Sequence, residues 1–136
     1  MPDTPPESKH AGSILLVEDD EFLRDLIARS LEAAGFETAV ARDGESALKA
    51  AAAHVPDLIL LDLILPGMSG LELIAKLHQE EATAKIPFIV LSNSAETQSK
   101  QQSEQMGAEA YLVKAQSTPP EIVQAVIAWF AGRKGS

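Results

Sequence analysis

The segment PDLILLDLILPGMSG, residues 56–70, limits the possible folds of this 136-residue chain more than any other stretch. Residues 58–61 are apolar without alternation, which is typical of a strand buried on both faces of a parallel sheet. Asp62 ends this strand and precedes a turn that contains Pro66 and Gly67. A carboxylate in that position points into the crevice where open parallel sheets bind ligands, although a turn or helix-capping aspartate is the alternative interpretation.

Length and composition exclude several kinds of protein. A chain of 136 residues, 46% of them apolar, forms one domain with a proper core. Its formal charge of -9 argues against direct binding of nucleic acids or anionic membrane surfaces, which require basic patches. The chain has no cysteine, its apolar runs are too short to cross a bilayer, and residues 1–12 lack a signal-peptide core. We therefore expect a cytoplasmic protein without disulfides or zinc-thiolate sites.

Strand patterns alternate with helix patterns five times between residues 13 and 131. Strands are expected at residues 13–18, 36–41, 57–62, 87–92 and 110–114. The second of these alternates apolar with polar residues, as an exposed edge strand does, whereas most of the others are apolar throughout. Residues 1–12 and 132–136 are predicted to be a flexible N-terminal tail and a polar C-terminal tail on this single domain.

The helices between these strands are identified by apolar stripes and by capping residues. Asp43 is expected to cap the second helix, and segments 69–72 and 118–121 have the spacing of capping boxes. The fourth helix, residues 97–106, has almost no apolar stripe and is expected to be the least stable. The residues expected to face the core are Leu23, Leu26, Ile27, Ser30, Leu31 and Ala34 in the first helix, Ala47, Leu48 and Ala51 in the second, Leu73, Ile74 and Leu77 in the third, and Ile122, Val126, Ile127, Trp129 and Phe130 in the fifth.

Strands that alternate with helices in this way form a parallel sheet with helices on both faces. With the second strand at an edge, the expected order is 2-1-3-4-5, which is the flavodoxin-like, doubly wound α/β fold with five strands and five helices. The ligand crevice of this fold lies between strands one and three, where the strand order reverses. The fold therefore brings Glu18, Asp19 and Asp20, at the end of the first strand, beside Asp62.

Carboxylates that lie this close repel one another unless some are protonated or a cation lies among them. A set of oxygen ligands without nitrogen or sulfur favours a hard ion, so Mg²⁺ or Mn²⁺ fits better than Zn²⁺. The alternative is that Asp19 or Asp20 merely caps the first helix, and one of the two is expected to do so.

Ser92 ends the fourth expected strand and Lys114 ends the fifth, at the same end of the sheet as the acids. Taken singly, they would be a turn serine and a surface lysine. Together with Asp62 and a divalent ion, a hydroxyl and an ammonium are the groups that phosphoryl transfer to a carboxylate requires.

With these groups the chain resembles the receiver domains of two-component response regulators over about residues 13–131. The matching segments are ILLVEDD, LLDLILPGMSG, FIVLS and GAEAYLVK. The resemblance implies that a histidine kinase or a histidine-phosphotransfer protein donates a phosphoryl group, and that a downstream protein binds the face formed by the fourth helix, fifth strand and fifth helix. The roles that it implies are Asp62 as phosphoacceptor, Glu18, Asp19, Asp62 and the main-chain oxygen of Ile64 as Mg²⁺ ligands, and Ser92, Asn93, Tyr111 and Lys114 as phosphoryl-binding or switching residues.

Two residues depart from the family pattern. Asn93 stands where alanine or glycine is usual, which narrows access to the site or adds an amide contact. Ala115 stands where proline is usual, and because a cis bond before alanine costs about 3 kcal/mol, we expect a trans bond and a rearranged loop. The two side chains that help to orient the hydrolytic water in the family correspond here to Ile64 and Ser94, neither of which is suited to that task.

Functions of three classes are compatible with these residues. The favoured one is a signalling module, resembling stand-alone receivers, whose only chemistry is Mg²⁺-dependent self-phosphorylation and self-dephosphorylation at Asp62. A degenerate receiver that acts as a constitutive interaction scaffold is the first alternative, and the intact site argues against it. The second is an enzyme on a similar sheet, such as a phosphatase or a flavin protein, but the chain has no Asp-x-Asp-x-Thr segment after the central strand and no phosphate-binding loop after the first.

Overall fold

The computed structural model describes residues 12–93 and 97–134. These residues form the strands β1 (Ser13–Val17), β2 (Glu37–Ala41), β3 (Leu58–Asp62), β4 (Phe88–Ser92) and β5 (Ala110–Val113). They also form the helices α1 (Glu21–Ala33), α2 (Gly44–Ala53), α3 (Gly70–Gln79), α4 (Thr97–Gln105) and α5 (Pro119–Lys134), with a 3-10 turn at Lys114–Gln116. None of the helices in the described ranges is long and apolar enough to cross a membrane.

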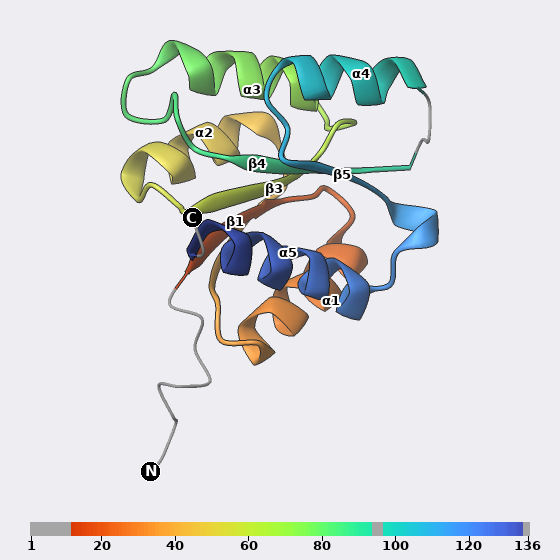
Figure 1. Ribbon diagram of the computed structural model, residues 1–136. Helices are drawn as coiled ribbons and strands as arrows, with labels where there is room; N and C mark the ends of the chain where they lie inside the picture. Colours follow the sequence, from red (N-terminus) through yellow and green to blue (C-terminus); the bar gives the residue numbers. More distant parts are fainter. Residues whose placement is uncertain (1–11, 94–96, 135–136) are drawn as a thin grey trace.

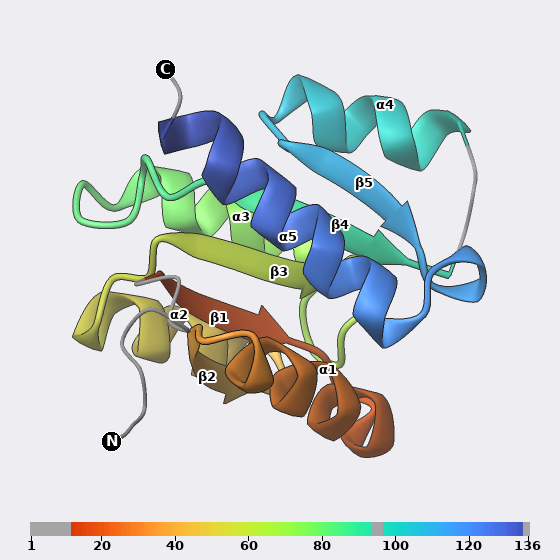
Figure 2. The ribbon, with the colours of Figure 1, turned by 60° about the horizontal axis from the view of Figure 1, so that its bottom comes forward.

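The strands form one parallel sheet in the order β2-β1-β3-β4-β5, which confirms the predicted flavodoxin-like topology (Figure 2). The inner strands β1, β3 and β4 are buried along almost their whole length. This burial explains why their sequences are apolar without alternation. Because all strands run the same way, their last residues gather at one end of the sheet, called here the carboxyl end.

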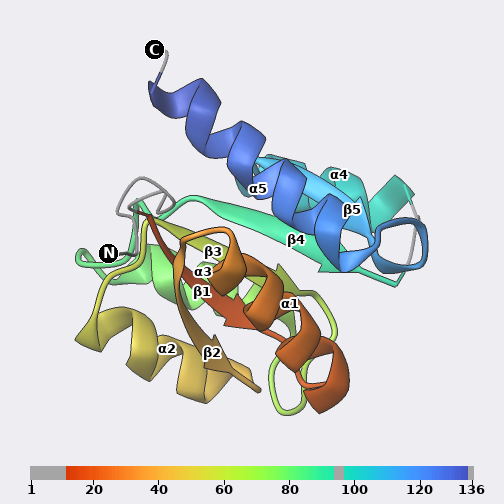
Figure 3. The same ribbon diagram turned by 90° about the horizontal axis from the view of Figure 1, so that it is seen from below.

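Helices cover both faces of the sheet (Figures 1 and 3). α1 and α5 pack against each other on one face, over a core cluster that includes Ile14, Leu16 and Leu60. α2, α3 and α4 lie on the other face, over a cluster that includes Leu15 and Leu61. Each fully buried aliphatic side chain contributes about 1.5–3 kcal/mol through the hydrophobic effect. The two clusters therefore hold the ends of the inner strands in fixed positions.

One residue predicted to face the core is exposed. Leu26, which the stripe of α1 placed in the core, is 39% exposed because the helix meets the core through Ile27 and Leu31. Val40 is 48% exposed, in agreement with the exposed edge strand predicted at residues 36–41. It belongs to β2, which has β1 as its one neighbouring strand in the sheet, so the helices cover it incompletely.

The described residues include positions on both sides of the limits expected for the domain. Gly12 is buried, and its carbonyl oxygen accepts a hydrogen bond from Glu37 N–H at 3.0 Å. The rest of the predicted N-terminal tail, residues 1–11, lies outside the described residues. At the other end, α5 continues to Lys134, into the segment predicted to be a polar tail, because basic residues suit the last turn of a helix.

Capping side chains fix the starts of the helices near the carboxyl end of the sheet. Asp43 caps α2, as predicted, by accepting a hydrogen bond from Ser46 N–H at 2.8 Å. The predicted capping box of α3 is also present between Ser69 and Glu72. Reciprocal hydrogen bonds within segment 118–121 cap α5 in the same way. Such caps contribute about 1 kcal/mol each.

α4 differs from the other helices, as its sequence predicts. Among its described side chains only Ser103 is buried, and the hydroxyl of Ser103 donates to the main-chain oxygen of Lys100 at 2.9 Å. The helix thus buries little apolar surface of its own. We expect it to be held less firmly than α3 on the same face of the sheet.

Candidate functional site

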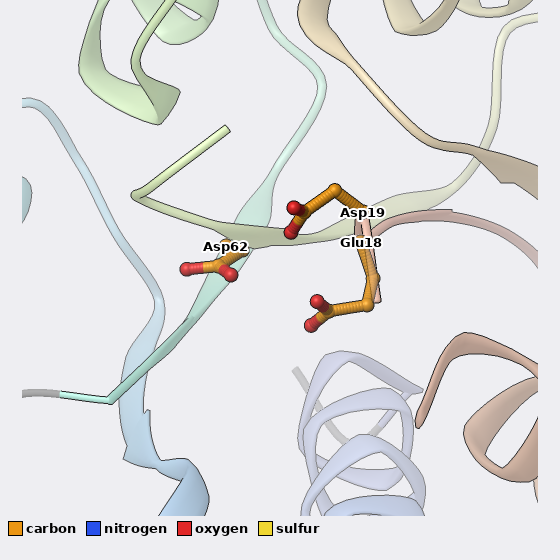
Figure 4. A group of neighbouring side chains, drawn as sticks. All are labelled: Glu18, Asp19 and Asp62. Carbon is orange, nitrogen blue, oxygen red and sulfur yellow. The ribbon is translucent and has the colours of Figure 1, made fainter. Parts of the chain in front are cut away.

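Three carboxylates meet at the carboxyl end of the sheet. Glu18 and Asp19 follow β1, Asp62 ends β3, and these two strands are paired neighbours. One oxygen of each carboxylate lies within 4.8 Å of the other two, and Glu18 and Asp19 are directed toward the space beside Asp62 (Figure 4). Glu18 is 0% and Asp62 3% exposed, whereas Asp19 is exposed. The juxtaposition with Asp62 predicted from the strand order is therefore confirmed for Glu18 and Asp19.

Lys114 bridges two of these acids. Its Nζ lies 2.7 Å from Asp62 Oδ2 and 2.6 Å from Glu18 Oε1. The contact with Asp62 is a hydrogen bond, whereas the contact with Glu18 is an ion pair without hydrogen-bond geometry. The lysine side chain is only 11% exposed, so it is part of the site and not an ordinary surface lysine.

Burial and ion pairing act in opposite directions on these groups. Burial raises the pKa of Glu18 above its usual value, against the lowering effect of the Lys114 ammonium. Burial alone would lower the pKa of Lys114, but its contacts with Asp62 and Glu18 outweigh that effect and raise the pKa. Lys114 therefore keeps its positive charge at neutral pH and partly compensates the negative charge of the acids.

The sequence predicted that either Asp19 or Asp20 caps α1, and in the structure the cap is Asp20. Asp20 Oδ1 accepts a hydrogen bond from Leu23 N–H at 3.1 Å, at the start of α1. Asp20 N–H donates to Glu18 Oε2 at 3.1 Å, so the cap and the buried acid are linked. Asp19 is left to face the carboxylate cluster.

The donor set fits a hard divalent cation. Glu18 Oε1 is buried with the Lys114 ammonium 2.6 Å away, and a carboxylate oxygen has a second lone pair that a metal cation can bind. All three side chains offer oxygen only, the ligand that Mg²⁺ prefers. The acidic pocket of Glu18, Asp19 and Asp62 could therefore hold a metal ion beside the Lys114 ammonium.

The loop after β3 positions Asp62 through its main chain. Ile64 N–H donates to Asp62 Oδ1 at 3.1 Å, while the Ile64 side chain is 68% exposed. Gly67 has a positive φ of 86°, which favours glycine in this turn. The Pro66–Gly67 sequence predicted a turn here, but no feature of the sequence indicated that an amide of the loop would bind the carboxylate of Asp62.

The strand pairing also places the predicted switching residues. Ser92 is 2% exposed at the end of β4, beside Val113 of β5, the residue before Lys114. Tyr111 is half-buried in β5 and packs against the core cluster on the α2 and α3 side. Asn93 is exposed after β4, and Ser94 lies outside the described residues.

The peptide bond after Lys114 agrees with the expectation drawn from Ala115. No peptide bond in the described residues is cis, so the Lys114–Ala115 bond is trans. The chain turns immediately into the 3-10 turn at Lys114–Gln116.

Comparisons with known proteins agree with this site and fold. Residues 14–127 match the response regulator receiver domain family. The phosphate regulon transcriptional regulatory protein PhoB of Pseudomonas aeruginosa is 41% identical over 111 residues, which cover 82% of this chain and 48% of PhoB. The polar-differentiation response regulator DivK of Brucella ovis is 40% identical over 107 residues, which cover 79% of this chain and 87% of DivK. The structure of the chemotaxis response regulator CheY4 of Vibrio cholerae matches with a TM-score of 0.78 and 27% identity, covering 88% of this chain and 98% of CheY4.

The sheet order and the acid-lysine site define a signalling domain of the two-component class. The chain belongs to the response regulator receiver family. It spans about half the length of PhoB, so the activity of that whole regulator is not transferred to this chain.

Proposed function

We propose that Asp62 accepts a phosphoryl group and that this modification changes which protein the chain binds. The observation that supports the proposal most is the buried contact of 2.7 Å between Lys114 Nζ and Asp62 Oδ2 within the acidic pocket. An ammonium in that position can neutralise the oxygens of an incoming phosphoryl group.

The proposed reaction is transfer from a phosphorylated histidine of a histidine kinase or phosphotransfer protein. A carboxylate oxygen of Asp62 attacks phosphorus, the phosphorus–nitrogen bond of the donor breaks, and the imidazole leaves with the bonding electron pair. The product is an acyl phosphate on Asp62. Glu18, Asp19, Asp62 and the main-chain oxygen of Ile64 would hold Mg²⁺, or Mn²⁺, which supplies positive charge for the phosphoryl oxygens when bound.

The chain's own residues prepare Asp62 for this reaction. The amide of Ile64 holds one carboxylate oxygen and the ammonium of Lys114 holds the other. Both donors are in place before any phosphoryl group arrives, so little reorganisation is required during transfer. In self-dephosphorylation, water attacks the phosphorus of the acyl phosphate, the phosphorus–oxygen bond to Asp62 breaks, and inorganic phosphate leaves. No other catalytic activity is proposed.

The output surface is proposed to be the face formed by α4, β5 and α5. The weak packing of α4 supports this choice, as does a cavity of about 390 Å³ lined by residues of α4, β5 and the following turn, including Lys100, Tyr111 and Gln116. Ser92 and Tyr111 would couple this face to Asp62. The names of PhoB and DivK refer to different pathways, so they favour no particular downstream partner.

Incubation with acetyl phosphate and Mg²⁺, followed by intact-protein mass spectrometry, tests the proposal. The native chain should gain the mass of one phosphoryl group, and Asp62→Asn should gain none while remaining folded. Asp25→Asn, at an exposed position of α1, is the control and should be labelled like the native chain. Undiminished labelling of Asp62→Asn would contradict the proposed acceptor, and failure of the native chain to take up phosphate would favour the constitutive scaffold.

A further inference from the structure

We propose that Arg24 is a positioning residue for the metal-binding acids, which fixes the direction in which Asp19 presents its carboxylate. The inference rests on the metal site proposed above and adds to it a side chain that acts through the main chain of Glu18. Its basis is a hydrogen bond in which Arg24 Nη1 donates to the main-chain oxygen of Glu18 at 3.0 Å.

Hydrogen bonds hold both peptide groups that flank Asp19. The first, between Glu18 and Asp19, is held through its oxygen by the Arg24 guanidinium. The second, between Asp19 and Asp20, is held through its N–H, which donates to Glu18 Oε2 at 3.1 Å. A peptide group is planar, so fixing one of its atoms by a directed hydrogen bond restricts the whole plane. Together the two bonds limit the backbone rotation at Asp19.

This restriction matters more for Asp19 than for the other two acids. Glu18 and Asp62 are buried and in contact with Lys114, so packing and ion pairing hold their side chains. Asp19 is exposed and lacks that support. The position of its carboxylate within 4.8 Å of the other two therefore depends on how its backbone is held.

Arg24 is itself held in place by the start of α1. Its N–H donates to the main-chain oxygen of Asp20 at 2.8 Å, while the Asp20 side chain caps the helix through Leu23 N–H. The first turn of α1 and the acid pair thus form one hydrogen-bonded unit. The Arg24 side chain is partly buried as it reaches back to Glu18, the residue that follows β1.

The charge of Arg24 would have the opposite effect on metal affinity. A cation close to the acids repels Mg²⁺, so if Arg24 acted through charge alone, its removal would strengthen Mg²⁺ binding. If Arg24 positions Asp19, its removal weakens Mg²⁺ binding. The sign of the change in affinity separates the two effects.

The test is a titration with MgCl₂ in the absence of any phosphodonor, followed through backbone amide signals by NMR. Arg24→Met keeps most of the aliphatic stem and removes the donor, and it should weaken Mg²⁺ binding by about tenfold, as loss of an outer partner of a metal ligand typically does. Arg29→Met removes the same charge from an exposed position of α1 and should leave the affinity near the native value. Unchanged or tighter binding by Arg24→Met, or an equal loss in Arg29→Met, would overturn the inference.

Arg24→Lys keeps the positive charge and serves as the second variant if Arg24→Met does not fold. It should bind Mg²⁺ less tightly than the native chain, because a shorter point donor cannot reproduce the guanidinium contact. Native affinity in Arg24→Lys would show that charge suffices and would overturn the positioning role. If the native chain itself does not bind Mg²⁺, the proposed metal site is wrong. If the native chain binds Mg²⁺ and the Arg24 variants bind it with the same affinity, only the proposed role of Arg24 is wrong.

Discussion

Gly70 lies directly against the main chain of Asp62. A Cβ atom added to Gly70 would lie 2.5 Å from the Asp62 carbonyl oxygen and 2.7 Å from Leu63 Cα. Gly70 N–H donates to the carbonyl oxygen of Leu63 at 2.8 Å, so α3 begins in contact with the main chain of the residue after the proposed phosphoacceptor. A residue without a side chain permits this approach.

Gly70→Ala should therefore destabilise the protein even though alanine is the better helix former. Main-chain atoms cannot move aside as a flexible side chain can, and overpacking of this kind costs about 1–3 kcal/mol. Urea denaturation measures the free energy of unfolding of the variant and of the native protein. Gly132→Ala in α5, where an added Cβ has no atom within 4 Å, is the control and should not lose stability. Equal stability of Gly70→Ala and the native protein would show that the backbone adjusts without cost.

The fold could be predicted from the sequence because each inner strand carries the same signal. The unbroken apolar runs of β1, β3 and β4 identify strands buried on two faces, and the alternating helices allow few strand orders. Leu26 was assigned wrongly to a buried position, because periodicity indicates a side of a helix but not how far a neighbouring element covers it.

The acids and the lysine of the site were predictable for a similar reason. Glu18, Asp62 and Lys114 interrupt or end apolar segments, so a parallel sheet brings them together. The approach of Gly70 to Asp62 and the contact of Arg24 with Glu18 were not predictable. Both contacts are made to main-chain atoms, which every residue has, so the residue types in the sequence do not indicate where such contacts form.

The Asp43 cap predicts a pH dependence of stability. Hydrogen bonds from Ser46 N–H and the Ser46 hydroxyl hold the pKa of Asp43 below its usual value of 3.8. A lowered pKa in the folded state means that the ionised cap stabilises the protein above the unfolded pKa and that this contribution is lost as the pH falls through the folded pKa. The native protein should be more stable to thermal unfolding than Asp43→Asn near neutral pH, and this difference in stability should shrink as the pH falls. A carboxylate titration of Asp43 by NMR at or above 3.8 would contradict this account.

Magnesium should raise the thermal stability of the native protein. The three carboxylates face one ammonium, so a divalent cation binds the folded state preferentially and stabilises it by about 2.7 kcal/mol at a hundredfold excess over its dissociation constant. Asp19→Ala should lose most of this stabilisation. Asp25→Ala, at an exposed position of α1, should retain it. A melting temperature of the native protein that saturating Mg²⁺ does not change would exclude the proposed site.

Amide exchange should be faster in α4 than in the inner strands. Among the described side chains of α4 only Ser103 is buried, whereas β3 is buried throughout. Little apolar surface must be exposed to open α4, so it opens at low free energy. Hydrogen–deuterium exchange checks this, with α3 as the comparison because it buries Leu73, Ile74 and Leu77 on the same face. Protection of α4 equal to that of β3, unaffected by a phosphoryl mimic, would argue against α4 as a switching element.

The lifetime of the acyl phosphate should be long, because neither Ile64 nor Ser94 can position the hydrolytic water well. The Ile64 side chain is exposed beside Asp62 and has no hydrogen-bonding group, and serine is too short to reach far. Loss of such positioning should slow hydrolysis by about ten- to a hundredfold relative to a well-placed polar pair.

We therefore expect the phosphorylated native chain to last many minutes or longer. The double substitution of Ile64→Asn and Ser94→Glu should accelerate its decay, as followed by the mass of the phosphorylated protein after removal of the donor. Each single substitution shows which of the two positions carries the effect, and Asn93→Ala tests whether that neighbouring amide shields the phosphoryl group instead. Decay of the native phosphoprotein within seconds, or an unchanged rate in the double variant, would show that these two side chains do not control the lifetime.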